Sequence, residues 1–176
     1  SSAASDVYKR QIMQCDMESV YFNCILNNPT ITTVGNFAYT FKCDVTCDAP
    51  WAWEYPKSAT YGPFDVEGTF TFNNISDDNY YMLPTFTVTL SSSEDEFQLL
   101  NQTDNNKGCT FTGLSPKETL TIDSSRYLIT SSTGLLRVGN MTGILPRLVP
   151  GLNKLQVIGS VDDIKIDYQN ARKVSG

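Results

Sequence analysis

The chain has 176 residues, a formal net charge of −6 and no histidine. Without histidine the sequence offers no Ser-His or Cys-His nucleophile pair and no His-containing zinc site. An acidic chain without a basic cluster does not suit nucleic acid, whose affinity comes mainly from Lys and Arg, and no apolar run here reaches the roughly eighteen residues of a membrane span.

The first eleven residues, "SSAASDVYKRQ", show neither an apolar period nor turn chemistry. Read back into codons, they resemble the adapter oligonucleotide of transposon-based sequencing libraries. We therefore interpret residues 1–11 as an adapter-derived scar that is not native, and expect the true N-terminus to lie upstream. Residues 12–176 are long enough for one domain and part of another.

The dominant period in the rest of the chain is two. In "NFAYTFKCDVTCDAP" one strand face carries six successive matches to the alternating pattern: Phe37, Tyr39, Phe41, Cys43, Val45 and Cys47. Shorter strands are predicted at 19–26, 68–72, 85–91, 96–102, 109–113, 118–123, 126–131, 154–160 and 163–168. Because turn signals separate these runs and no segment keeps a helical period, the sequence predicts an all-β sandwich or barrel.

The segment "CDAPWAWEYPKSATYGPF" breaks this pattern with three prolines and five aromatic residues. Proline fixes φ and cannot donate to a strand ladder, so we expect the chain to leave the first sheet here. The predicted organisation is a remnant of an upstream β domain at residues 12–54, a linker at 55–62 and a sandwich domain at 63–176.

The aromatic residues of that segment, Trp51, Trp53 and Tyr55, recur at period two. An extended backbone would place the three rings on one side, where they could stack on a sugar or pack as an apolar plug between domains. The position in a linker favours packing. These aromatic residues are the only candidate site residues that we single out.

Catalytic, metal and cofactor sites are not expected. The five cysteines have irregular spacing, so they are interpreted as reduced, small apolar side chains rather than a disulfide framework. Acidic neighbours occur at residues 77–78, 94–96 and 162–163, but adjacent carboxylates in polar turns do not face each other across a substrate. They are interpreted as solvated turns in preference to calcium ligands.

Two turns have a specific local chemistry. Pro150-Gly151 can form a type II turn, with the glycine supplying positive φ, and Asn153 can then bond nearby backbone. In "TLTIDSSRYLIT" the Asp123 side chain is placed to satisfy turn amides, and we expect Leu120 and Ile122 to oppose Tyr127 and Ile129 across a hairpin.

Several pieces in this order resemble siphophage distal tail proteins. "SVYFNCIL" followed by "FAYTFKCDVTCDAPWAW" resembles the end of the N-terminal domain of that family. "FTFNNISD", "CTFTGLSPKETLTIDSSRYLIT" and "LPRLVPGLNKLQVIGSVDDIKIDYQ" resemble its C-terminal sandwich, which has a galectin-like jelly-roll topology. The resemblance covers essentially all of residues 20–170.

The resemblance implies a structural virion protein, made in the host cytoplasm, that connects the tail tube to the adhesion hub. Its partners would be further copies in a hexameric ring, the tape-measure protein and the tail-tip adhesin, and it would be no enzyme. Because only two strands of the ring-forming domain are expected here, we do not expect this chain to form the full ring alone. A carbohydrate-binding module for host cell-wall polysaccharide is the alternative, although galectin-type sites use a histidine that is absent here.

Overall fold

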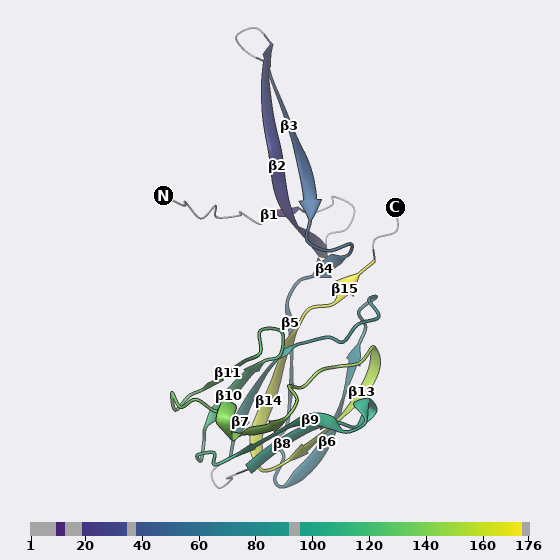
Figure 1. Ribbon diagram of the computed structural model, residues 1–176. Coiled ribbons are helices and arrows are strands. Elements are labelled where there is room, and N and C mark those ends of the chain that lie inside the picture. The colour runs from purple at the N-terminus through teal and green to yellow at the C-terminus, as the bar shows by residue number, and fades with distance from the viewer. Residues whose placement is uncertain (1–9, 13–18, 35–37, 92–95, 174–176) are drawn as a thin grey trace. The chain divides into compact units, whose positions relative to one another are not determined.

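The computed structural model describes residues 10–12, 19–34, 38–91 and 96–173. The chain divides into two compact units. The first unit combines Ser1–Tyr55 with Ala171–Gly176, and the second is Pro56–Asn170 (Figure 1). Most of the buried apolar side chains among the described residues belong to the second unit.

This second unit is a sandwich of two antiparallel five-stranded sheets. One sheet has the order β11-β10-β7-β14-β5, with bounds Leu128–Ser131, Thr119–Asp123, Thr85–Leu90, Val161–Tyr168 and Lys57–Tyr61. The other has the order β12-β9-β8-β13-β6, with bounds Met141–Gly143, Lys107–Thr112, Glu96–Asn101, Gly151–Ile158 and Glu67–Asn74. The predicted all-β sandwich is therefore confirmed.

Helical structure in the described residues is limited to two short 3₁₀ turns, η1 at Gln102–Asp104 and η2 at Val138–Asn140. No helix in this part of the chain is long and apolar enough to cross a membrane.

The core lies between the two sheets and follows the period of two. In β7 the side chains of Phe86, Val88 and Leu90 are buried, while the threonines between them are half-buried. In β14 the register shifts after Val161, so that two acidic residues face outward before Ile164 returns to the core. The facing sheet supplies Phe70, Phe72, Phe97, Leu99, Phe111, Leu155 and Val157.

Turn chemistry sets the ends of these strands. Gly151 has φ +84°, as the third residue of a type II turn requires, and the buried Asn153 side chain bonds the backbone of Val149 and Gly151. The Asp123 carboxylate accepts the amides of Ser125 and Arg126, as expected.

The β10–β11 hairpin differs in part from its predicted register. Ile129 lies across from Ile122, one of the two residues predicted to face it, but Leu120 opposes Ser131 and Tyr127 has no partner in the ladder. Tyr127 lies in the turn with φ +54° and is exposed. The turn is longer than predicted and includes Tyr127, which was expected to lie in the strand.

Two domain boundaries need correction. The middle of the expected linker at 55–62 is strand β5, which pairs with β14 along the edge of the sandwich. Prolines precede and follow β5, so neither removes a hydrogen bond from its ladder. At the other end, β15 (Ala171–Arg172) pairs with β4 (Ala52–Glu54), so the chain returns to the first unit after Asn170.

The first unit is built on a long antiparallel hairpin of β2 (Val20–Val34) and β3 (Ala38–Cys47) (Figure 1). The first strand was predicted to end at Leu26, but β2 continues to Val34. A β-bulge between Asn27 and Thr30 accommodates Asn28, which has φ +48°, and the pairing with β3 resumes after it. Strand β1 (Arg10–Ile12) also pairs with β2. Two of its residues belong to the segment interpreted as a scar, whose remaining residues 1–9 lie outside the described part.

Candidate assembly surfaces

The β2–β3 hairpin has one apolar face and one polar face. On the apolar face Phe41 and Val45 of β3 are 58% and 51% exposed, and Leu26 of β2, directly opposite Val45, is 36% exposed. We call these three residues, with the half-buried Cys43, the hairpin stripe. Phe37 lies outside the described residues, so its predicted place in this row is not assigned.

The polar face of the same hairpin is closed by side-chain bonds between the two strands. Asn28 donates to the Asp44 carboxylate at 2.9 Å, and Asn27 donates to the Thr46 hydroxyl at 3.2 Å. All four of these side chains are exposed, so this face is in contact with water. The hairpin stripe, in contrast, is an exposed apolar row. Among the described residues β3 pairs only with β2, so its other edge has no neighbouring strand.

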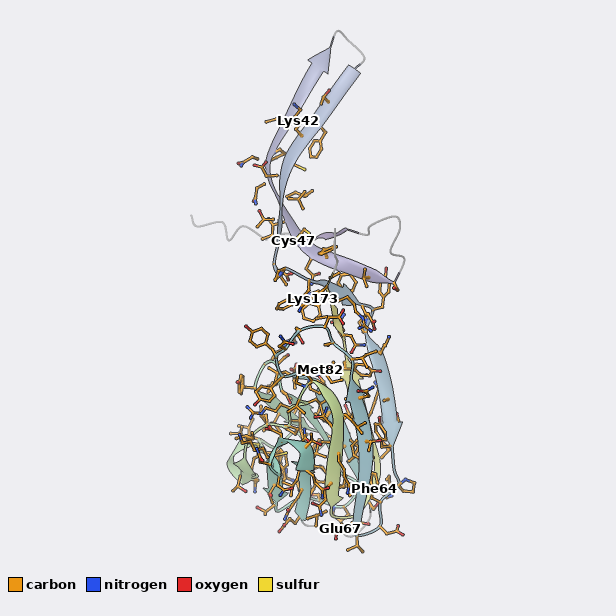
Figure 2. The ribbon with its side chains drawn as sticks, turned by 90° about the vertical axis from the view of Figure 1, so that its right-hand side faces the viewer. Lys42, Cys47, Phe64, Glu67, Met82 and Lys173 are labelled. Carbon is orange, nitrogen blue, oxygen red and sulfur yellow. The ribbon has the colours of Figure 1, made fainter. Side chains whose placement is uncertain are left out.

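Near the base of the hairpin, Cys24 and Cys47 face each other (Figure 2 labels Cys47). Their Sγ atoms are 3.0 Å apart, and both cysteines are free. The sequence did not predict this pair, because the contact between the two cysteines depends on the register of the hairpin. Cys109 is buried inside the sandwich, where burial raises the pKa of its thiol to about 12. Cys15 lies outside the described residues.

The predicted aromatic row at 51–55 forms ring pairs inside the first unit. The rings of Trp51 and Trp53 meet edge to face with centroids 6.1 Å apart, and Tyr55 packs on Tyr21 at 5.5 Å. Both tryptophans are only half-exposed. The Trp51 Nε1 is buried and has no acceptor among the described residues.

The opposite face of β4 holds a pair that sequence reasoning missed. Ala52 and Glu54 are buried, and Glu54 accepts a hydrogen bond from Arg172 of β15 at 2.6 Å. Because Arg172 follows the whole sandwich in sequence, only the return of the chain to the first unit could reveal this partner. The ion pair fixes β15 beside β4.

Inside the sandwich, the most buried ionic contact joins Glu118 to Arg137. The Arg137 Nε and Nη2 donate to the two Glu118 carboxylate oxygens at 2.7 and 2.6 Å, and both side chains are almost fully buried. Burial by itself raises the pKa of Glu118. Hydrogen bonds from Arg137, Ser131 and the Ser115 amide, together with the Arg137 charge, outweigh burial and leave that pKa below its ordinary value.

A second arginine, Arg147, links two loops at one end of the sandwich. Its Nε donates to the buried Asp104 carboxylate at 2.7 Å, and its guanidinium lies 3.8 Å from the centre of the Tyr81 ring. Tyr80 next to it is exposed. This arrangement fixes the loop that precedes β13 against η1, the turn that follows β8.

Of the acidic neighbours noted in the sequence, Asp162 has a structural role. Asp162 bonds Lys117 and the Ser91 hydroxyl at 2.8 Å each. Glu94 and Asp95 lie outside the described residues. Across the part of the chain that the structure describes, no group of three His, Cys, Asp or Glu side chains could hold a metal ion.

The sandwich and the adjoining aromatic segment match a family model that is described as "phage tail C-terminal domain", over residues 51–168. The chain belongs to this family. It is therefore a bacteriophage tail component, and its family is one of tail structural proteins.

Among solved structures, the phage tail chain is similar to the Dit protein (gp 19.1) of SPP1, which is described as a paradigm of the hub adsorption apparatus in phages that infect Gram-positive bacteria. The TM-score is 0.67 at 12% identity, so the likeness is one of fold. It covers 90% of this chain and 64% of the Dit chain, and no curated protein matches. The predicted resemblance to distal tail proteins is confirmed by the family and the fold.

Proposed function

We propose that this phage tail chain is part of a distal tail protein, which connects the tail tube to the adhesion hub without catalysing a reaction. The observation that carries the proposal is the hairpin stripe in a chain with the fold of Dit. The partners would be the tail tube, the tape-measure protein and the hub or adhesin. The sandwich would take the place of the galectin-like domain, outside the ring.

The chemistry of the hairpin supports assembly by contact with another copy. A two-stranded ribbon is at best marginally stable in water, and exposed strand edges pair readily with another chain. Phe41 and Val45 place apolar area where a neighbouring sheet would cover it, while the paired amides and carboxylate stay on the wet face. A symmetric ring arises when such a head-to-tail contact closes.

The aromatic residues Trp51, Trp53 and Tyr55 are proposed to pack in this ring-forming unit. In the edge-to-face contact of the two tryptophans, the edge of one ring covers a face of the other, which leaves that ring one face fewer for a sugar. The carbohydrate-binding alternative would gain support if the chain bound host cell-wall glycans and lost that binding on Trp51→Ala or Trp53→Ala.

The test is the mass of the full-length protein in solution, measured by light scattering behind a sizing column. We expect a hexamer for the natural sequence and monomers for the double variant Phe41→Glu, Val45→Glu. The matched control is Val66→Glu with Leu152→Glu, which changes two apolar residues of the sandwich that are 71% and 62% exposed. A hexamer that survives the stripe variant, or one that only the control breaks, would contradict the proposed contact.

A further inference from the structure

The two thiols at the base of the hairpin occupy directly opposed positions on neighbouring strands. Cys24 of β2 and Cys47 of β3 are Cα partners, and their Sγ atoms are 3.0 Å apart. Cys24 is buried, whereas Cys47 is exposed. One thiol is thus open to a reagent in solution, and the other lies directly behind it.

The hydrogen-bond pattern shows which kind of cross-strand pair this is. The next pair along the ladder joins Asn23 and Asp48, where the Asp48 amide donates to the Asn23 carbonyl at 3.0 Å. Hydrogen-bonded and non-hydrogen-bonded pairs alternate along antiparallel strands, so Cys24 and Cys47 form a non-hydrogen-bonded pair. In such pairs the Cα atoms are about 4.5 Å apart, which lies within the range that a disulfide spans.

We propose that Cys24 and Cys47 are a modification site, at which exchange with a small-molecule disulfide such as oxidised glutathione produces an intrachain disulfide across the hairpin.

The exchange has two steps, and its atoms and electrons balance. The Cys47 thiolate attacks one sulfur of glutathione disulfide, which forms a mixed disulfide and releases one glutathione thiolate. Cys24 then loses its proton to solvent and attacks the Cys47 sulfur, which closes the Cys24–Cys47 bond and releases the second glutathione thiolate. The two cysteines are oxidised by two electrons, and one glutathione disulfide is reduced to two thiols.

The environment of Cys24 supports this order of attack. Burial, the hydrogen bond with Cys47 and the negative charges of Cys47 and Asp48 raise the pKa of Cys24 to about 11. Cys24 is therefore protonated at neutral pH and is poorly suited to react first. Once Cys47 carries glutathione, the adjacent Cys24 is the sulfur in place to complete the exchange.

The bond would fix the register of the ribbon below the hairpin stripe. Its timing in the phage rests on the proposed function, because a tail protein is made in reducing cytoplasm and serves in the oxidising surroundings of the free virion. The hairpin would assemble with both thiols reduced and be locked afterwards. The chemistry of the pair itself does not depend on that role, so the two proposals can fail separately.

The test uses the complete chain with Cys15→Ser and Cys43→Ser, incubated with oxidised glutathione, alkylated and digested with trypsin. Cleavage after Lys42 separates the two remaining hairpin cysteines, so a disulfide between them holds two tryptic peptides together. We expect the linked peptides in oxidised samples and two alkylated peptides after reduction. Cys109, buried in the sandwich, serves as an internal thiol that stays reduced.

Single variants distinguish the two steps. Adding Cys24→Ser should leave glutathione trapped on Cys47, because nothing resolves the mixed disulfide. Adding Cys47→Ser should leave Cys24 unmodified, because the open thiol is gone. Thermal unfolding of each variant shows whether the sandwich is still folded. Recovery of Cys24 and Cys47 as separate alkylated peptides from oxidised chains, or stable glutathione on Cys47 with Cys24 present, would overturn the proposal.

Discussion

At the scale of single residues, the contact with the largest expected effect on stability is the one between Glu118 and Arg137. The guanidinium also donates to the Gly113 carbonyl at 2.7 Å, so it joins two loops as well as one carboxylate. Removing one partner of a buried ion pair leaves an uncompensated charge.

We expect Arg137→Met to lower the free energy of unfolding of the sandwich by about 3–5 kcal/mol. The measurement is urea unfolding at pH 7. The double variant Glu118→Gln, Arg137→Met should recover much of the loss, because it buries no lone charge. An Arg137→Met chain as stable as the natural one would show that the pair contributes little.

The Glu118 carboxylate also makes the free energy of unfolding depend on pH. The folded-state pKa of Glu118 lies below its ordinary value of 4.5, so its contribution is fully present above pH 4.5 and is lost as pH falls through the folded pKa. The pKa values of Asp123, Asp162 and Asp167 are lowered too, which gives the same sign.

We therefore expect the unfolding temperature to fall as pH drops below about 4.5, and to fall less steeply in Glu118→Gln than in the natural chain. Differential scanning calorimetry from pH 7 to pH 3 measures both slopes. Equal slopes would mean that Glu118 titrates alike in the folded and unfolded states.

At the scale of elements, Gly108 in β9 allows β8 and β9 to lie close together. A Cβ at Gly108 would lie 1.9 Å from the Leu99 carbonyl oxygen, a contact that only backbone movement could relieve. Gly139 in η2 has nothing within 4 Å of such a Cβ.

Gly108→Ala should accordingly lower the free energy of unfolding by more than about 3 kcal/mol, because both strands must shift. Gly139→Ala should change it by less than about 1 kcal/mol. Chemical denaturation of the two variants side by side gives the comparison. Similar values for both would show that β9 adjusts without strain.

Strands in which apolar and polar residues alternate could be predicted from the sequence. Strands whose extent depends on the strand they pair with could not. The runs at β3, β7 and β10 carry their own period of two, so their faces were evident. β5 was missed because the prolines around it resemble those of a linker. The full length of β2 was missed because Asn28-Pro29 is typical of a strand end, although here a β-bulge accommodates it.

The residues of the candidate surfaces were likewise predictable only where a local pattern marked them. The exposed row of Phe41 and Val45 was visible as an alternating pattern, and Trp51 and Trp53 were singled out by their spacing. The Cys24–Cys47 and Glu54–Arg172 pairs depend on hairpin register and on the return of β15, which no local pattern encodes. The partner of Glu118 lies in an irregular loop, where spacing carries no signal.

At the scale of the whole molecule, the sandwich unit should fold without the hairpin unit. Its chain enters through β5 and leaves after β14, two neighbouring strands in which Lys57 opposes Tyr168. The main core cluster lies within Pro56–Asn170.

We expect residues 56–170 expressed alone to unfold cooperatively, within a few degrees of the sandwich transition in the complete chain. Calorimetry of both proteins makes the comparison. A truncated chain without a folding transition would mean that the sandwich needs the first unit for its stability.

The proposed role in the phage is tested most directly by locating the protein on virions. Antibodies raised against residues 56–170 and carried on gold particles should label the far end of the tail tube in electron micrographs, at the junction with the adhesion hub. Label on the capsid, or spread evenly along the tube, would contradict the account of this chain as part of a distal tail protein.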